Sequence, residues 1–314
     1  MKRQLAFAIS LFALTACGGG TTVAPSAGSV HPNARAALHA YKIYVTDEGA
    51  NTVTVYDRNG MQVTPTIGDG LDYPNSIAVD QNGKIYVVNF NPLGGQSTNG
   101  TVTTYLPDGT RTAPTITIEE RGYWAPTGIA VDKSGKIFVL SSVHDGSPGR
   151  VVTYAPDGRR TSLTFRTGAD SAGLTIDGNG KIYVTNDEAA NRKGSVTTYL
   201  PDGSPTTPTI THGIDQPAGI AVDGSGTIYV ANSNNSGPDG ELSGFVTLYN
   251  SDGSGPVQRI RTRRLGSDGI AVNTDGKFYL VNGNGSVTTY SRNGRRIDPT
   301  ITAGLIAPSG IALH

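Results

Sequence analysis

Few residues of this 314-residue chain are of a type and spacing that suits catalysis. Two short segments could supply an acid–base pair, His144 with Asp145 and His212 with Asp215. Isolated histidines of this kind are more often surface residues. The chain has no Gly-x-Ser-x-Gly nucleophile motif, no His-Glu-x-x-His zinc motif and no glycine-rich phosphate-binding fingerprint. The sequence therefore favours a protein that binds over one that catalyses.

The single cysteine, Cys17, follows a segment typical of an export signal. Lys2 and Arg3 precede a short apolar stretch, which ends in Leu14-Thr15-Ala16-Cys17. A basic start, a short apolar core and small residues at the end mark a secretory signal. The last four residues resemble a bacterial lipobox, which implies cleavage before Cys17 and lipid on its thiol. The alternative is an ordinary signal peptide that ends beside an unrelated cysteine.

These features divide the chain into residues 1–17, the lipoprotein signal, residues 18–40, a flexible linker, and residues 41–314, the folded domain. The linker is rich in Gly, Ala, Ser, Thr and Pro and has no alternation that would bury a face. A lipid anchor would place the protein in the bacterial cell envelope. Because Gly18 and not Asp follows the cysteine, resemblance to the enterobacterial sorting rule implies the outer membrane where the host has one.

Three short sequence elements each occur six times from Tyr41 onward. They are variants of Gly-Ile-Ala-Val-Asp, as at residues 128–132, of Lys-Ile-Tyr-Val, as at residues 181–184, and of Val-Thr-Thr-Tyr, as at residues 196–199. A weaker fourth run, often Pro-Thr-Ile, follows a turn such as Pro107-Asp108-Gly109. Four β-rich runs separated by Gly, Asp and Asn turns are typical of a four-stranded antiparallel sheet. Six such units predict an all-β, six-bladed β-propeller.

The repeat is permuted at the two ends of the domain. The domain begins with a second-strand element, Lys42 to Val45, and the sequence finishes with a first-strand element, Ile311 to Leu313. We therefore predict that the C-terminal strand completes the N-terminal blade as its innermost strand. This pairing would close the ring and remove free sheet edges.

The three repeated elements resemble NHL-type propeller repeats over residues 41–314. The resemblance implies a module that binds a protein, peptide or other ligand without catalysis. Related six-bladed folds include the gluconolactonase/regucalcin group, which implies a metal-dependent periplasmic hydrolase as the alternative. A propeller lyase is a further alternative, although the streptogramin lyases have seven blades. Charge is balanced, with 25 acidic and 25 basic residues, so we expect no nucleic-acid partner.

Repeated polar residues are expected to be architectural. Aspartates three residues before a glycine predict Asx-type turns, and the recurrent tyrosines predict packing or hydrogen bonds between blades. The residue that ends each second strand is polar, and we expect it to cap the following loop; these residues are Asp47, Asn89, Ser141, Asn186, Asn232 and Asn282. Resemblance to the gluconolactonase group implies instead a divalent cation at the channel mouth, with Asp47, Asn186 and Asn232 as candidates. Because Asp47 is the only acid in this set, no cofactor is expected.

Aromatic residues that depart from the repeat mark the candidate binding site. Strand alternation puts the loops after second strands and before first strands on one face. Those loops contain Tyr73, Phe90, Tyr123 and Trp124, with Arg121 beside them. Exposed aromatics beside charges are typical of glycan-, peptide- and protein-binding surfaces. We predict that a monomeric protein binds its ligand here, the alternative being that these rings cap the blade interface as local core.

Overall fold

The computed structural model describes residues 41–90, 100–118, 125–143, 145–188, 193–233, 244–262 and 267–314. The chain divides into Met1–His39 and Ala40–His314. Cys17, the signal and the linker therefore lie outside the described residues. In the part of the chain that the structure describes, no helix is long and apolar enough to cross a membrane.

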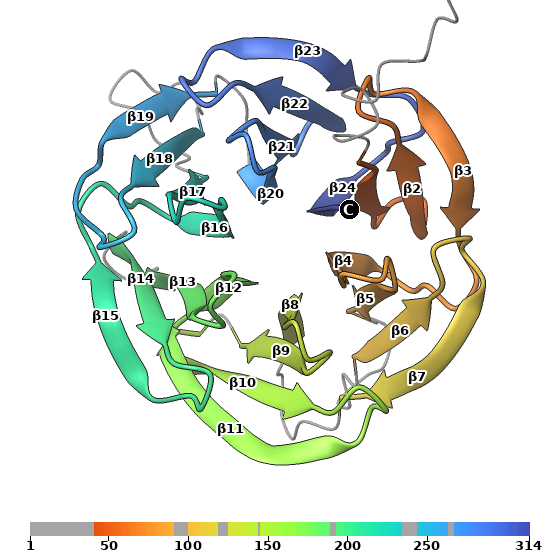
Figure 1. Ribbon diagram of the computed structural model, residues 1–314, viewed down its shortest axis with the longest axis horizontal. Helices are drawn as coiled ribbons and strands as arrows, with labels where there is room; N and C mark the ends of the chain where they lie inside the picture. The colour runs from red at the N-terminus through yellow and green to blue at the C-terminus, as the bar shows by residue number, and fades with distance from the viewer. Residues whose placement is uncertain are drawn as a thin grey trace, which may run out of the picture. The chain divides into compact units, whose positions relative to one another are not determined.

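The folded domain is a ring of six four-stranded antiparallel sheets, as predicted (Figure 1). From the innermost strand outward, blade 1 is β24 (Pro308–Leu313), β1 (Ile43–Asp47), β2 (Thr52–Tyr56) and β3 (Gln62–Ile67), and blade 2 is β4 (Pro74–Val79), β5 (Ile85–Asn89), β6 (Thr101–Tyr105) and β7 (Arg111–Thr117). Blade 3 is β8 (Ala125–Val131), β9 (Ile137–Ser142), β10 (Pro148–Tyr154) and β11 (Arg160–Ala169), and blade 4 is β12 (Ser171–Ile176), β13 (Ile182–Glu188), β14 (Lys193–Tyr199) and β15 (Pro205–Ile210). Blade 5 is β16 (Pro217–Val222), β17 (Ile228–Asn232), β18 (Phe245–Tyr249) and β19 (Gln258–Arg261), and blade 6 is β20 (Ser267–Val272), β21 (Phe278–Asn282), β22 (Ser286–Tyr290) and β23 (Arg296–Ile301).

The C-terminal strand closes the ring, which confirms the prediction from the permuted repeat. β24 pairs with β1 in antiparallel register, with Ile43 opposite Leu313 and Val45 opposite Ile311. The pairing continues beyond the strand, because the Lys42 N–H donates to the His314 carbonyl oxygen (2.6 Å). β24 also lies between β4 and β20 around the central channel (Figure 1). The first and last segments of the domain are thus joined in one blade.

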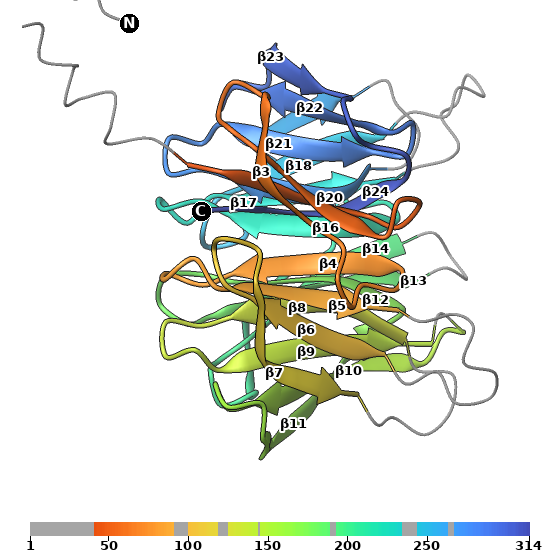
Figure 2. The same cartoon turned by 90° about the vertical axis from the view of Figure 1, so that its right-hand side faces the viewer.

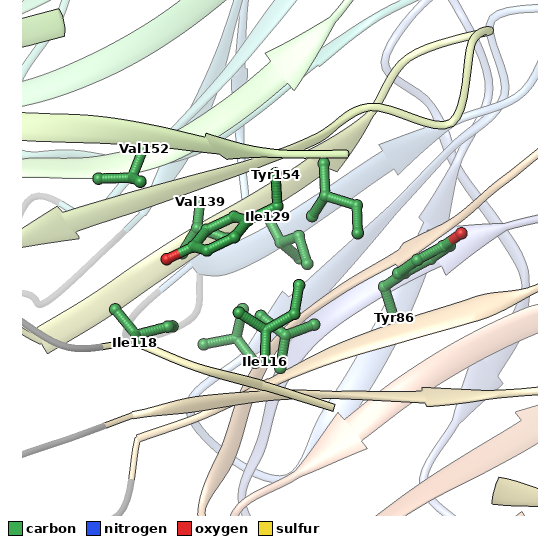
Figure 3. Close-up of a cluster of buried hydrophobic side chains, with 10 residues drawn as sticks. Tyr86, Ile116, Ile118, Ile129, Val139, Val152 and Tyr154 are labelled. Atoms are coloured by element: carbon green, nitrogen blue, oxygen red, sulfur yellow. The ribbon is translucent and has the colours of Figure 1, made fainter. Parts of the chain in front are cut away.

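The hydrophobic core fills the spaces between adjacent blades. Every residue of the second strands β5 and β17 is buried, because both faces of each sheet pack on neighbouring sheets. Figure 3 shows the contact between blades 2 and 3, where Tyr86 and Ile116 of one blade meet Ile129, Val139 and Val152 of the next. Fully burying such a side chain contributes about 2 kcal/mol, so the six interfaces are the main source of stability.

The inner strands approach one another closely enough to require glycine. A Cβ atom on Gly173 would lie 2.4 Å from the Ala218 carbonyl oxygen, and one on Gly269 would lie 2.6 Å from the Ser309 carbonyl oxygen. Both contacts are with the backbone of the next inner strand, which cannot move aside as a flexible side chain would. This close approach explains the glycine in the first repeated element. The inner strands enclose a central channel with a volume of about 680 Å³.

The ring has two distinct faces, seen edge-on in Figure 2. We call the end where first strands begin and second strands end the loop face. The opposite end, where tight turns join first to second strands and third to fourth strands, is the turn face. The C-terminus lies at the turn face (Figure 2).

Candidate functional site

The aspartates of the turn face are committed to local structure. Asp80 Oδ1 accepts hydrogen bonds from the backbone N–H groups of Asn82 (2.8 Å) and Lys84 (3.0 Å). The Tyr86 hydroxyl donates to the other carboxylate oxygen of Asp80 (3.2 Å). Burial, followed by the charge of Asp80, raises the pKa of Tyr86, which keeps its hydroxyl protonated as a donor. The same arrangement recurs at Asp177, which confirms the predicted Asx-type turn.

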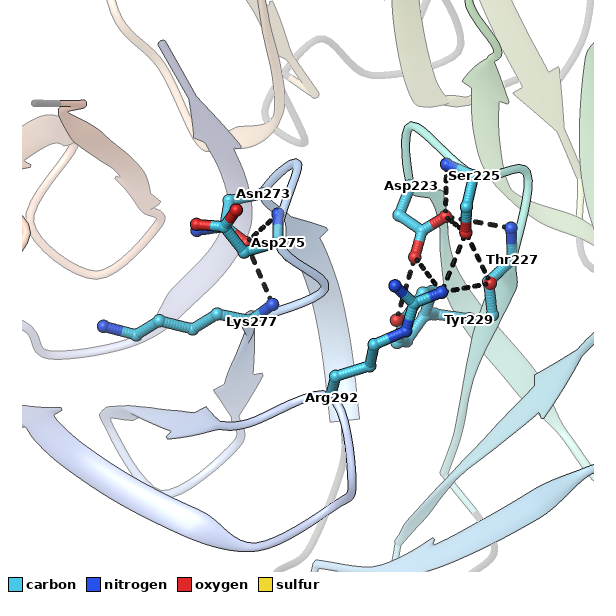
Figure 4. Close-up of polar contacts among 8 residues, drawn as sticks. All are labelled: Asp223, Ser225, Thr227, Tyr229, Asn273, Asp275, Lys277 and Arg292. Atoms are coloured by element: carbon cyan, nitrogen blue, oxygen red, sulfur yellow. Dashed lines mark hydrogen bonds and ion pairs between the residues drawn. The ribbon is translucent and has the colours of Figure 1, made fainter. Parts of the chain in front are cut away.

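Blade 5 departs from this arrangement and receives its cation from blade 6. In blades 2 and 4 a lysine nitrogen lies 5.5 Å from the centre of the second-strand tyrosine ring, but blade 5 has Thr227 at that position. Arg292 of blade 6 donates to Ser225 Oγ (2.9 Å) and Thr227 Oγ1 (3.3 Å). Its guanidinium also lies 3.5 Å from Asp223 Oδ2 (Figure 4). These contacts link two blades, so we assign this cluster a structural role.

Three of the third-strand tyrosines hold the connections that enter their blades on the loop face. The hydroxyls of Tyr56, Tyr105 and Tyr249 donate to the carbonyl oxygens of Ala303, Asp69 and His212, each at 2.6 Å. Burial raises the pKa of Tyr56 to about 12, so this hydroxyl stays a donor. The predicted inter-blade role of these tyrosines is confirmed. His212 is itself exposed, and His144 of the other candidate pair lies outside the described residues.

Several polar residues at the ends of the second strands act as buried clamps, whereas Ser141 Oγ and Asn282 Oδ1 have no hydrogen-bond partner in the part of the chain that the structure describes. Asn89 Oδ1 accepts a hydrogen bond from the Asp72 N–H (3.1 Å), while Asn89 Nδ2 donates to Thr101 and Thr103 (3.1 and 3.2 Å). The clamp therefore joins the connection that precedes the blade to the third strand of that blade. The prediction that these residues cap the loop that follows them holds for Asp47, which accepts a hydrogen bond from the Ala50 N–H (2.9 Å). It is wrong for Asn89, because the inner strand lies beside the second strand and brings its preceding connection within reach.

The metal candidates Asp47, Asn186 and Asn232 occupy clamp positions and are no more than 1% exposed. The carboxylate of Asp47 accepts three backbone N–H groups, those of Ala50 (2.9 Å), Ile306 (2.6 Å) and Ala307 (3.1 Å). Asn232 Oδ1 accepts from the Asp215 N–H (3.0 Å), and Asn186 Oδ1 accepts from the Ser171 hydroxyl (2.8 Å). Within the described ranges, no group of three His, Cys, Asp or Glu residues could hold a metal ion.

Two of the predicted site residues are brought together on the loop face. The Phe90 N–H donates to the Tyr73 carbonyl oxygen (3.0 Å), and the Tyr73 N–H donates to Asn51 Oδ1 (2.7 Å). Tyr73 is 38% exposed and Phe90 is partly exposed. The other predicted residues of this corner, Arg121, Tyr123 and Trp124, lie outside the described residues.

Sequence reasoning missed a further exposed apolar residue on this face, Ile306. It is 69% exposed and lies in the connection that enters blade 1. A Cβ atom on Gly49 would lie 2.8 Å from Ile306 Cγ2, so the loop that contains Gly49 and Asn51 separates Ile306 from Tyr73. At the position of Ile306, the connections into blades 2 and 5 have Asp72 and Asp215. The apolar residue in blade 1 departs from this pattern, and that departure could have identified Ile306 from the sequence. We call Tyr73, Phe90 and Ile306 the loop-face patch.

Comparisons with known proteins agree with the architecture. Residues 215–236, which contain β16 and β17, match the family described as NHL repeat. No curated protein matches the chain.

Several solved structures share the fold. A protein of unknown function from Bacteroides caccae has 14% identity and a TM-score of 0.60, over 87% of this chain and 98% of the other. A functionally unknown protein from Desulfotomaculum acetoxidans has 15% identity and a TM-score of 0.53, over 87% and 98%. Kuenenia stuttgartiensis hydrazine synthase has 17% identity and a TM-score of 0.59, over 80% of this chain and 73% of the other. At these identities the likeness shows the propeller fold alone.

Proposed function

We propose that this propeller is a non-catalytic binding module whose loop face receives a protein, peptide or glycan. The observation that carries the proposal is a contrast between two sets of residues. The repeated polar side chains form turns, clamps and inter-blade hydrogen bonds, as at Asp80, Asn89 and Tyr105. The loop-face patch instead leaves Tyr73 and Ile306 exposed. Exposed apolar side chains in loops that depart from a repeat are typical of a recognition surface.

The same proposal places the protein in the bacterial cell envelope. Lipid on Cys17 would anchor the chain, and more than one acyl chain is needed for stable anchoring. Residues 18–40 would then serve as a flexible tether, with the outer membrane as the location in a Gram-negative host. The protein would act as a monomer, without a resident cofactor and without a nucleic-acid partner.

The hydrolase alternative is less well supported by the geometry. A catalytic cation at the channel mouth would use the clamp residues as ligands, Asp47 above all. The oxygens of Asp47 already accept three backbone N–H groups, which hold the connection into the first blade. A metal at this position would have to compete with those hydrogen bonds.

Trp124→Ala is expected to abolish ligand binding and to leave the unfolding transition unchanged. A ligand identified on glycan and peptide arrays would be titrated against the wild type and the variant, with thermal unfolding followed in parallel. Met61→Ala is the matched control, because Met61 is 67% exposed on the turn face. Loss of folding in the Trp124 variant would show that this residue belongs to the core, and equal binding by the variant would contradict its role in recognition.

A further inference from the structure

The loop face is acidic. Its connections and the adjoining strand ends carry carboxylates at Glu48, Asp69, Asp72, Asp145, Asp170, Asp187 and Asp215. The described loop-face connections contain no lysine or arginine, and the adjoining strand ends carry two basic residues, Lys193 and Arg261. The turn face differs, because its turns carry both signs, as at Asp80 with Lys84 and Asp177 with Lys181.

The segments of the domain outside the described residues do not offset this excess. The segments 91–99, 119–124, 189–192, 234–243 and 263–266, which lie outside the described residues, contain four acidic residues and four arginines. Their formal charge is therefore balanced. Since the whole chain is also neutral, the charge asymmetry belongs to the face and not to the protein as a whole.

The loop-face patch lies within this acidic surface. Asp72 is adjacent to Tyr73 in sequence, and Glu48 precedes the glycine on which Ile306 packs. Tyr73 thus has two carboxylates near it in sequence, Asp69 and Asp72, that form no ion pair with another described residue.

Tyr73 is held in a conformation that a tyrosine does not favour. Its φ is +50°, in the left-handed region, and Asp170 and Gln216 adopt φ of +45° and +48° at the corresponding positions. The backbone of these connections therefore imposes the conformation, and glycine would adopt it at less cost. The aromatic residue at this position is only partly buried, because 38% of its surface is exposed. A role in binding explains why a tyrosine stands there.

We infer that the loop-face patch docks a basic peptide segment that carries an apolar side chain. The inference rests on the proposed function and specifies the partner. Tyr73 and Ile306 would contact the apolar side chain, while Asp69 and Asp72 would face its lysines or arginines. Such charge complementarity speeds encounter and excludes wrong partners. Anionic ligands, including nucleic acids and acidic glycans, would be repelled by the same carboxylates.

The test uses three fluorescent peptides of equal length and equal leucine and phenylalanine content, in which the remaining positions are lysine, glutamine or glutamate. We expect the full-length protein to bind the lysine peptide about tenfold more tightly than the glutamine peptide at low salt. The difference should shrink at physiological salt, where the screening length is about 8 Å. The glutamate peptide should bind most weakly.

Two sets of variants test the apolar and the charged contributions to peptide binding separately. Tyr73→Gly should weaken binding of the lysine peptide by about tenfold or more, with an unchanged or higher melting temperature because the left-handed φ suits glycine. Asp69→Asn combined with Asp72→Asn should weaken the lysine peptide about fivefold and leave the glutamine peptide unchanged. Met61→Ser and Asp275→Asn on the turn face are the matched controls and should change neither affinity.

Two results would overturn the inference. One is equal binding of the lysine and glutamine peptides, and the other is lysine-peptide binding that survives Tyr73→Gly. If no peptide binds but an array glycan does, and Trp124→Ala abolishes that binding, the peptide inference fails while the proposed function stands. If binding is lost only in the turn-face variants, both fail.

Discussion

Ending the chain after Pro308 is expected to unfold the whole propeller and not merely to fray its C-terminus. The truncation removes most of β24, including Ile311, which is 8% exposed and packs with Ile43, Val45 and Tyr279. It also removes the backbone ladder on β1 and the inner strand between β4 and β20. Domains of this kind are stable by only about 5–15 kcal/mol, and losing one inner strand exposes two blade interfaces. Circular dichroism should show no cooperative thermal transition.

The matched control removes only His314. This deletion eliminates the backbone pair between Lys42 and His314 but keeps Ile311 and the rest of β24. We expect a cooperative transition with a slightly lower midpoint. If the chain that ends at Pro308 instead unfolds like the control, closure by the last strand contributes little, and the account of the ring is wrong.

Asn232→Ala is expected to lower the free energy of unfolding by about 3 kcal/mol, because several buried polar groups lose their partners together. The side chain is fully buried. Its oxygen accepts from the Asp215 N–H (3.0 Å), and its amide donates to Val230 O (3.0 Å) and Thr247 Oγ1 (3.0 Å). Alanine would remove the partner that Asn232 supplies to each of these groups. Urea unfolding of the purified protein measures the loss.

Asn59→Ala provides the comparison for this clamp. Asn59 is an exposed turn-face residue that donates to Asp57 Oδ2 (3.3 Å), and exposed substitutions of this kind change stability by about 0.5 kcal/mol or less. An Asn232→Ala variant as stable as Asn59→Ala would show that the clamps are dispensable. The polar residues at the second-strand ends would then need another explanation, including the cation site.

The fold was predictable from the sequence because the same physical requirements recur six times. Gly173 and Gly269 must accommodate a neighbouring backbone, Asp80 and Asp177 must form turns, and the permuted ends must pair. Each requirement leaves the same residue type at the same place in successive blades. The blade number and the closure therefore follow from counting and ordering the repeats.

The candidate site was only partly predictable, because each of its residues departs from the repeat and occurs only once in the sequence. Tyr73 and Phe90 could be identified as off-pattern aromatics, but Ile306 is aliphatic and lies far away in sequence. Ile306 packs on the loop that contains Gly49, and the two segments become neighbours only because the ring closes. The direction of the clamps was also missed, since Asn89 contacts Asp72 across the sheet and not along the chain. The acidity of the loop face appears only when connections from separate blades are assigned to one side.

Hydrogen–deuterium exchange of the full-length protein, with and without the saturating lysine peptide, shows which face of the propeller the ligand covers. If the loop face is the binding surface, the peptide should slow exchange in residues 68–73 and 302–307, the connections that contain Tyr73 and Ile306. The turn-face segments 80–84 and 223–227 should exchange at the same rate in both samples. Protection confined to those turns, or no protection at the loop face with peptide bound, would contradict the account.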